Sequence, residues 1–74
     1  MDTGKVMSEI REELGISRAA MAKELGIKPQ SVWKIEKNKS FPKPKTIEKF
    51  CEVAKIPLAY FYAKAMTKED YIIK

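Results

Sequence analysis

The sequence predicts a small, compact all-α domain of five short helices, and three observations support this fold class. Apolar residues recur every three or four positions through most of the chain, which is the spacing of one helix face. Residues that begin or end helices stand between these stretches. Only residues 71–73 resemble a strand, and they are too few to form a sheet. With 74 residues we expect a single domain with a thin stability margin.

Two helices are expected before residue 27. The first begins at residue 3 or 4 and ends at Leu14, because Gly15 readily takes the left-handed conformation that closes a helix. The second follows the N-cap residue Ser17 and is closed by Gly26. Their apolar positions at helical spacing are Val6, Met7, Ile10, Leu14, Ala19, Met21, Ala22 and Leu25.

Three further helices are expected after residue 27. The third begins at Pro29, whose fixed φ suits the first helical position, and ends near Asn38. Two prolines within residues 39–45 exclude a continuous helix there. A fourth helix carries Ile47, Phe50, Cys51, Val53 and Ala54, and a fifth begins at Pro57 and carries Leu58, Phe61 and Tyr62. We divide the chain into a domain of residues 1–63 and a C-terminal tail of residues 64–74.

Positive charge is concentrated in the middle of the chain. Residues 28–49 contain seven basic and two acidic side chains, a net charge of +5, which equals the net charge of the whole chain. A localised positive field favours a polyanionic partner, because each neutralised phosphate releases condensed counterions. The alternative is a lysine-rich face that only meets solvent.

The composition excludes several classes of function. The chain has no histidine and one cysteine, Cys51, so it offers no zinc site and no base to activate the thiol, which we expect in the core. Three scattered glycines cannot form a phosphate-binding loop. We therefore expect no catalytic activity, no metal and no small-molecule cofactor. No apolar run approaches the ~20 residues that span a bilayer, no secretory signal is visible, and a single cysteine fits the cytoplasm.

Residues 18–37 have the pattern of two helices that cross at a steep angle. Ala22 is small where the two backbones approach, and Gly26 can make the tight turn between them. The residues expected to face inward on both sides of the turn are Met21, Leu25, Ile27, Val32 and Ile35. The opposite face of the second helix carries Gln30, Trp33, Lys34 and Lys37, which is too polar and basic for a face that packs in a core.

A longer string of residues continues this pattern between Met7 and Phe61. It comprises Ile10-Arg11, Gly15-Ile16-Ser17, Met21-Ala22, Leu25-Gly26-Ile27, Ser31-Val32, Ile35-Glu36-Lys37-Asn38-Lys39, Pro42, Ile47 and Ile56. The string resembles the lambda-repressor-like (Cro/XRE-type) helix-turn-helix family. The resemblance implies a five-helix domain that binds double-stranded DNA, as a homodimer on a palindromic operator, with the second helix of the motif in the major groove.

The resemblance also implies roles for individual residues. The positions that face base edges are Lys28, Pro29, Gln30, Trp33 and Lys34. The positions that contact phosphate are Arg18, Asn38, Lys39 and Ser40. We add Ser31 and the lysines Lys37 and Lys43 to the expected phosphate contacts. Arg11 and Glu36 match a structural salt bridge between the first and third helices. Position 18 is commonly glutamine in the family and position 20 commonly glutamate, so Arg18 and Ala20 depart from the pattern.

The chemistry of the base-facing residues leaves alternatives open. Gln30 can contact adenine N6 and N7 together, whereas Lys34 can reach either guanine or a phosphate. Trp33 can pack on a thymine methyl or sugar, or fold back onto the domain. Pro29 removes a side chain that could read a base.

The C-terminal part of the chain is rich in aromatic and aliphatic residues, more than a small core readily absorbs. We expect a dimer interface formed by Tyr60, Phe61, Tyr62, Tyr71 and Ile72. The function we expect is a sequence-specific DNA-binding transcriptional regulator, either a repressor or a controller. Two alternatives are the antitoxin of a toxin–antitoxin pair, with the tail bound to the toxin, and an adaptor that binds protein or RNA.

Overall fold

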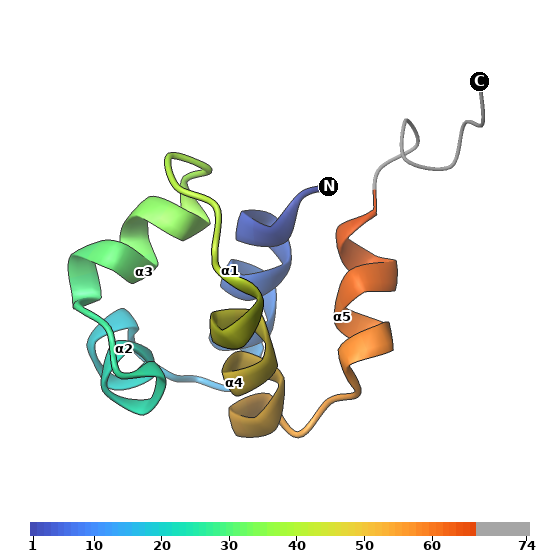
Figure 1. The fold of residues 1–74 in the computed structure, drawn as a ribbon. Coiled ribbons are helices and arrows are strands. Elements are labelled where there is room, and N and C mark those ends of the chain that lie inside the picture. Colours follow the sequence, from blue (N-terminus) through green and yellow to red (C-terminus); the bar gives the residue numbers. More distant parts are fainter. Residues whose placement is uncertain (67–74) are drawn as a thin grey trace.

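The computed structural model describes residues 1–66 and contains five α-helices in that part of the chain (Figure 1). They are α1 (Thr3–Glu13), α2 (Arg18–Leu25), α3 (Pro29–Glu36), α4 (Pro44–Ala54) and α5 (Leu58–Ala65). The all-α fold class predicted from the sequence is confirmed. No helix of residues 1–66 is both long and apolar enough to cross a membrane.

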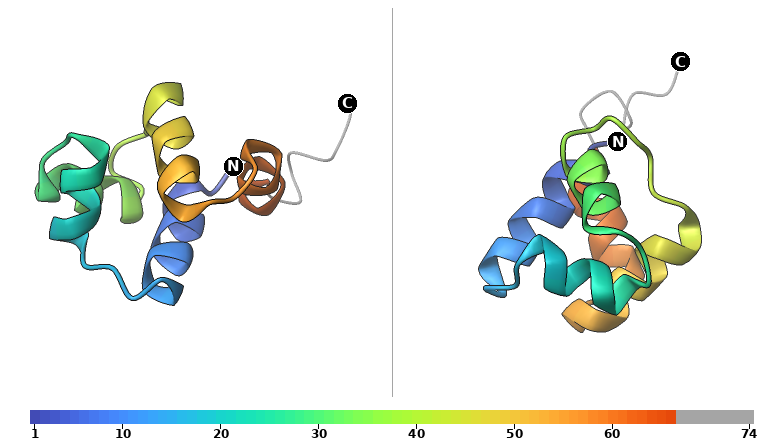
Figure 2. Two further views of the ribbon diagram at one scale, coloured as in Figure 1. Left: turned by 90° about the horizontal axis from the view of Figure 1, so that it is seen from below. Right: turned by 90° about the vertical axis from the view of Figure 1, so that its left-hand side faces the viewer.

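The helices are arranged with α1 and α4 in the middle, the α2–α3 pair on one side and α5 on the other (Figure 2). Helix α3 packs against α2 and α1, whereas α5 packs against α1 and α4. Helices α3 and α5 therefore lie at opposite ends of the molecule (Figures 1 and 2).

The residues predicted to begin and end helices do so. The Ser17 side chain accepts a hydrogen bond from the backbone N–H of Ala20 at 3.1 Å and so caps α2. This hydrogen bond uses the backbone of residue 20 and does not need a glutamate side chain there. Gly15 and Gly26 both have φ of 69°, in the left-handed region. Helix α3 ends at Glu36, two residues before the left-handed Asn38, which has φ of 58°.

The core lies between all five helices. Its largest fully buried side chains are Phe50, Phe61, Met7, Met21, Ile47 and Val32. The rings of Phe50 and Phe61 meet edge to face, with centroids 5.7 Å apart, and join α4 to α5. Helix α5 ends at Ala65, past the boundary at residue 63 that the sequence predicts, and Ala65 belongs to this core.

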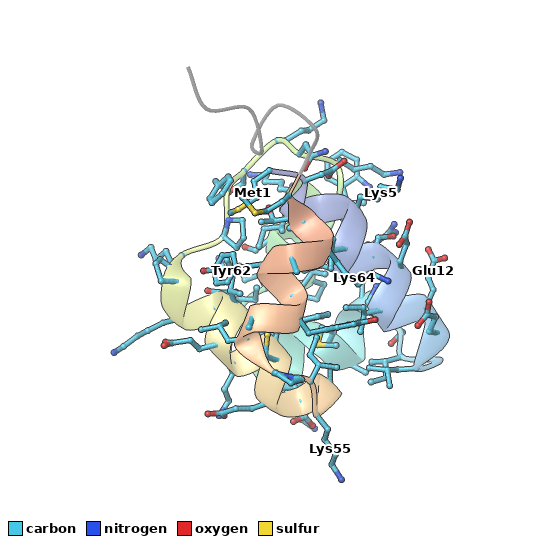
Figure 3. All side chains as sticks on the ribbon, turned by 90° about the vertical axis from the view of Figure 1, so that its right-hand side faces the viewer. Met1, Lys5, Glu12, Lys55, Tyr62 and Lys64 are labelled. Carbon is cyan, nitrogen blue, oxygen red and sulfur yellow. The ribbon has the colours of Figure 1, made fainter. Side chains whose placement is uncertain are left out.

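One residue assigned from the sequence to a dimer interface lies elsewhere. Phe61 is completely buried, so its side chain cannot contact a second copy, and that prediction is wrong. Phe61 points inward because it and Ala65, four positions apart, form the face of α5 that packs on α1 and α4. Figure 3, viewed from the α5 side, shows Tyr62 on the flank toward α4 and Lys64 on the flank toward α1. Tyr71 and Ile72 lie outside the described residues.

Candidate nucleic-acid interface

Helices α2 and α3 form the pair of crossed helices that the sequence predicts. Ala22 is fully buried, and its carbonyl oxygen accepts a hydrogen bond from the backbone N–H of Ile27 at 3.0 Å. Gly26 closes α2 in the left-handed conformation, which turns the chain into α3 within a few residues. Met21 and Val32 are fully buried on the two sides of this turn. The orientation of α3 is therefore fixed by packing against α2.

One face of α3 is buried and the opposite face meets solvent. The inward face consists of Val32, Ile35 and Glu36, each at most 8% exposed. All five residues predicted to face base edges, Lys28, Pro29, Gln30, Trp33 and Lys34, are exposed. The indole of Trp33 is 38% exposed, so it lies at the surface and outside the core. This outward face contains hydrogen-bonding, cationic and aromatic side chains and no carboxylate.

The surface that extends from α3 into the following loop is positively charged. Between residues 28 and 47 the sequence contains a single acidic residue, Glu36, which is buried. The six lysines of the same stretch are all exposed: Lys28, Lys34, Lys37, Lys39, Lys43 and Lys45. Of the residues predicted to contact phosphate, Lys37, Asn38, Lys39, Ser40 and Lys43 are exposed here, and Ser31 is half-buried. Because Glu36 is turned inward, residues 28–47 expose six lysines and no carboxylate of their own, and this excess of positive charge suits a polyanion.

Glu36 is held by two arginines from two other helices. Arg11 of α1 donates from Nε to Oε2 at 2.6 Å and from Nη2 to Oε1 at 3.2 Å. Arg18 of α2 donates from Nε to Oε1 at 2.9 Å. The side chain of Glu36 is only 2% exposed, so this cluster ties α1, α2 and α3 together at a buried point. The expected salt bridge between Arg11 and Glu36 is present.

The two arginines determine the charge state of Glu36. Burial disfavours the carboxylate and by itself raises the pKa of Glu36, but the hydrogen bonds and charges of Arg11 and Arg18 outweigh it. The net result is a pKa below the ordinary value for glutamate. The hydrogen bond to Glu36 likewise raises the pKa of Arg11. Glu36 is therefore a carboxylate at neutral pH and pairs with both arginines, and Arg11 also lies 3.7 Å from the exposed carboxylate of Glu12.

Arg18, predicted to contact phosphate, is also bonded to Glu36, a contact that was not predicted. The side chain of Arg18 is 39% exposed, compared with 10% for Arg11, so it is partly in the cluster and partly at the surface. The available signal was the arginine at position 18, where the family commonly has glutamine. Sequence spacing alone does not bring residues 18 and 36 together.

The turn after α3 is held by the N-terminal segment. Nδ2 of Asn38 donates a hydrogen bond to Oδ1 of Asp2 at 3.3 Å. The same Asp2 oxygen accepts the backbone N–H of Lys5 at 3.1 Å, which caps α1, and the backbone N–H of Asp2 donates to the carbonyl of Ala65 at 2.6 Å. Asp2 therefore connects the lysine-rich loop, residues 37–43 between α3 and α4, to α1 and α5. This role of Asp2 was not predicted, although an aspartate before a helix is a common N-cap.

The remaining chemically notable residue is away from this surface. Cys51 is 4% exposed in the core, as the sequence predicts, and burial raises the pKa of its thiol. Among residues 1–66, no three or more histidine, cysteine, aspartate or glutamate side chains come together as a metal site. The surface of α3 and its loop is thus the part of the described chain with the clearest binding chemistry.

Comparison with known proteins agrees with this geometry. A sequence model described as helix-turn-helix matches residues 7–61, which covers α2, α3 and α4 in full and most of α1. No curated protein matches the chain. The matched region includes the crossed helices, the Arg11–Glu36 pair and the lysine-rich loop. The chain therefore belongs to the Cro/C1-type helix-turn-helix family of DNA-binding regulators.

Proposed function

We propose that the protein is a sequence-specific transcriptional regulator that inserts α3 into the major groove of an operator. The observation that carries this proposal is the excess of exposed lysines on α3 and its loop, where the only acidic side chain of residues 28–47, Glu36, is turned inward. A helix about 10–12 Å wide with its side chains fits the B-DNA major groove, which is about 12 Å wide.

Within this proposal the exposed side chains divide into two groups. Gln30 and Lys34, in the first and second turns of α3, carry direct base recognition, with adenine and guanine as their preferred partners. Lys37, Lys39 and Lys43 contact backbone phosphates, which supply affinity and fix the position of α3 without reading sequence. Pro29 and Trp33 make apolar contacts with the DNA. They leave fewer side chains that can hydrogen-bond to bases than the family commonly has.

We further propose a two-fold homodimer formed through α5. The exposed apolar residues of this side are Leu58 at 39%, Tyr60 at 47% and Met66 at 37%, and Tyr62 is half-buried beside them. Because α5 lies opposite α3, a dimer through α5 leaves the positive surface available for DNA (Figure 2). The two copies of α3 should then lie about 34 Å apart, one turn of the duplex. Sedimentation of the protein alone and with operator measures the oligomeric state, and a monomer in both conditions would contradict the proposed dimer.

Selection of bound sequences from a random duplex pool tests the proposed function. We expect enrichment of a palindromic site with half-sites about 10 bp apart, and tight binding to that site when it is titrated. The enriched duplex with its half-sites scrambled is the matched control. Equal affinity for both duplexes at about 0.15 M salt would show that binding is non-specific. A small basic protein that co-purifies with the chain would instead favour the antitoxin class.

A further inference from the structure

Arg18 differs from Arg11 in how it is bonded. Arg11 uses Nε, Nη1 and Nη2, with Nη1 donating to the carbonyl of Ile16 at 2.7 Å, so three of its nitrogens are engaged inside the domain. Within residues 1–66, the only hydrogen bond of the Arg18 side chain is from Nε to Glu36. Arg18 is also nearly four times as exposed as Arg11, at 39% against 10%. The guanidinium of Arg11 is therefore bonded within residues 1–66 through all three nitrogens, whereas that of Arg18 is bonded there through Nε alone.

The geometry of a guanidinium makes this difference informative. The group is planar and rigid, so a hydrogen bond from Nε fixes the direction of the edge that carries Nη1 and Nη2. That edge has two parallel N–H groups whose spacing matches two oxygens of a phosphate. Arg11 holds Glu36 through two hydrogen bonds and Arg18 through one, so the Nη1–Nη2 edge of Arg18 is not used within the cluster.

The position of Arg18 places this edge beside the proposed DNA surface. Arg18 is the first residue of α2, and its partner Glu36 is the last residue of α3, directly before Lys37 and the lysine-rich loop. We propose that Glu36 is a positioning residue for DNA binding: it holds Arg18 by Nε and directs the Nη1–Nη2 edge to a backbone phosphate. This inference rests on the proposed function. It gives Glu36, which was predicted to be purely structural, a second role.

The substitution Glu36→Gln separates positioning from simple electrostatics by the sign of its effect. Removing a negative charge next to a positive surface should tighten binding to DNA if only net charge matters. If Glu36 positions Arg18, the variant should bind the selected duplex about tenfold more weakly, because an oriented, charge-assisted phosphate contact is lost. Glu52→Gln is the matched control, since Glu52 is an exposed carboxylate on α4. Circular dichroism must show each variant folded at the assay temperature.

A double-mutant cycle tests whether the effect passes through Arg18. Arg18→Gln should bind about tenfold more weakly and lower the slope of log Kobs against log salt by about one per protomer. On the Arg18→Gln background, Glu36→Gln should cause no further loss. Lys49→Gln removes an exposed charge from α4 and should leave the salt slope nearly unchanged. A loss that persists without Arg18 would mean that Glu36 supports only the fold, and it would overturn the inference.

Arg18→Lys covers the case in which Glu36→Gln does not fold. Lysine keeps the charge, but its ammonium group is not planar and stands on a flexible stem. A bond to Glu36 therefore cannot direct two parallel N–H groups to a phosphate. We expect Arg18→Lys to bind nearly as weakly as Arg18→Gln, and binding equal to the unsubstituted protein would overturn the inference. A failure of the unsubstituted protein to prefer the selected duplex is a different result, because it contradicts the proposed function itself.

Discussion

Gly4 of α1 packs directly against the carbonyl oxygen of Ile35, in the last turn of α3. A Cβ atom at position 4 would collide with that oxygen, would lie 2.5 Å from Oδ1 of Asn38 and would lie 3.0 Å from the carbonyl oxygen of Glu36. The start of α1 therefore meets the end of α3 backbone to backbone. The partial charges of the two helix ends are opposite, so this approach is also electrostatically favourable.

The substitution Gly4→Ala should destabilise the protein by about 1–3 kcal/mol, because the methyl group must displace backbone atoms of α3. The sign of the change in the free energy of unfolding is informative, because helix propensity alone predicts that alanine stabilises the protein by about 0.5–1 kcal/mol. Lys5→Ala, at the next and exposed position, is the control and should change stability by less than about 0.5 kcal/mol. Urea unfolding measures both variants, and a more stable Gly4→Ala protein would contradict the close contact.

Removing the Asp2 side chain should loosen the same junction. Asp2→Ala loses the N-cap of α1 and the bond from Asn38, and we expect a loss of about 1 kcal/mol. Asp2→Asn is the control, because its carbonyl oxygen can still accept the N–H of Lys5. The two variants are compared by thermal unfolding, and equal stability of Asp2→Ala and the unsubstituted protein would exclude the cap as a stabilising element.

The stability of the protein should depend on the ionisation of Glu36. Its pKa is lowered in the folded state, so its contribution is fully present above the ordinary value of 4.5 and is lost as pH falls through the folded value. At neutral pH, Glu36→Gln should cost about 3 kcal/mol, because two arginines lose their charged partner. This difference from the unsubstituted protein should shrink below about pH 4.5. A difference that stays constant from pH 7 to about pH 3 would contradict the charged cluster.

The thiol of Cys51 should be unreactive in the folded protein. Burial restricts access and raises the pKa of the thiol, so little thiolate is present at neutral pH. We expect an aromatic disulfide reagent to label it at least about a hundredfold more slowly than in concentrated guanidinium chloride, where the chain is unfolded. Labelling at the unfolded rate would mean that α4 does not pack as described.

The helices were predictable because their ends depend on local chemistry. Ser17 caps α2 through an atom three residues away, and Gly26 and Pro29 act through their own backbone preferences. The exposed face of α3 was predictable for the same reason, since helical spacing separates Gln30 and Lys34 from the buried positions. These features need no knowledge of how the helices are placed in space.

The contacts that hold the site in place were not predictable in this way. Asp2 and Asn38 are separated by 36 positions in the sequence, and Arg18 and Glu36 by 18 positions. The need for glycine at position 4 arises only when α1 meets α3. Phe61 was misassigned because a helix with aromatic residues at successive positions does not reveal which ring faces the core. Its partner Ala65, four residues later, was the signal that favoured burial.

The central claim, that α3 reads base edges, is tested most directly by repeating the random-pool selection with Gln30→Ala. We expect the variant to enrich a site altered at one base pair in each half-site, with adenine no longer preferred there, while the other positions stay the same. Loss of about 1–3 kcal/mol of discrimination should be confined to that base pair. An identical enriched site, bound with unchanged or uniformly weaker affinity, would show that Gln30 does not read a base.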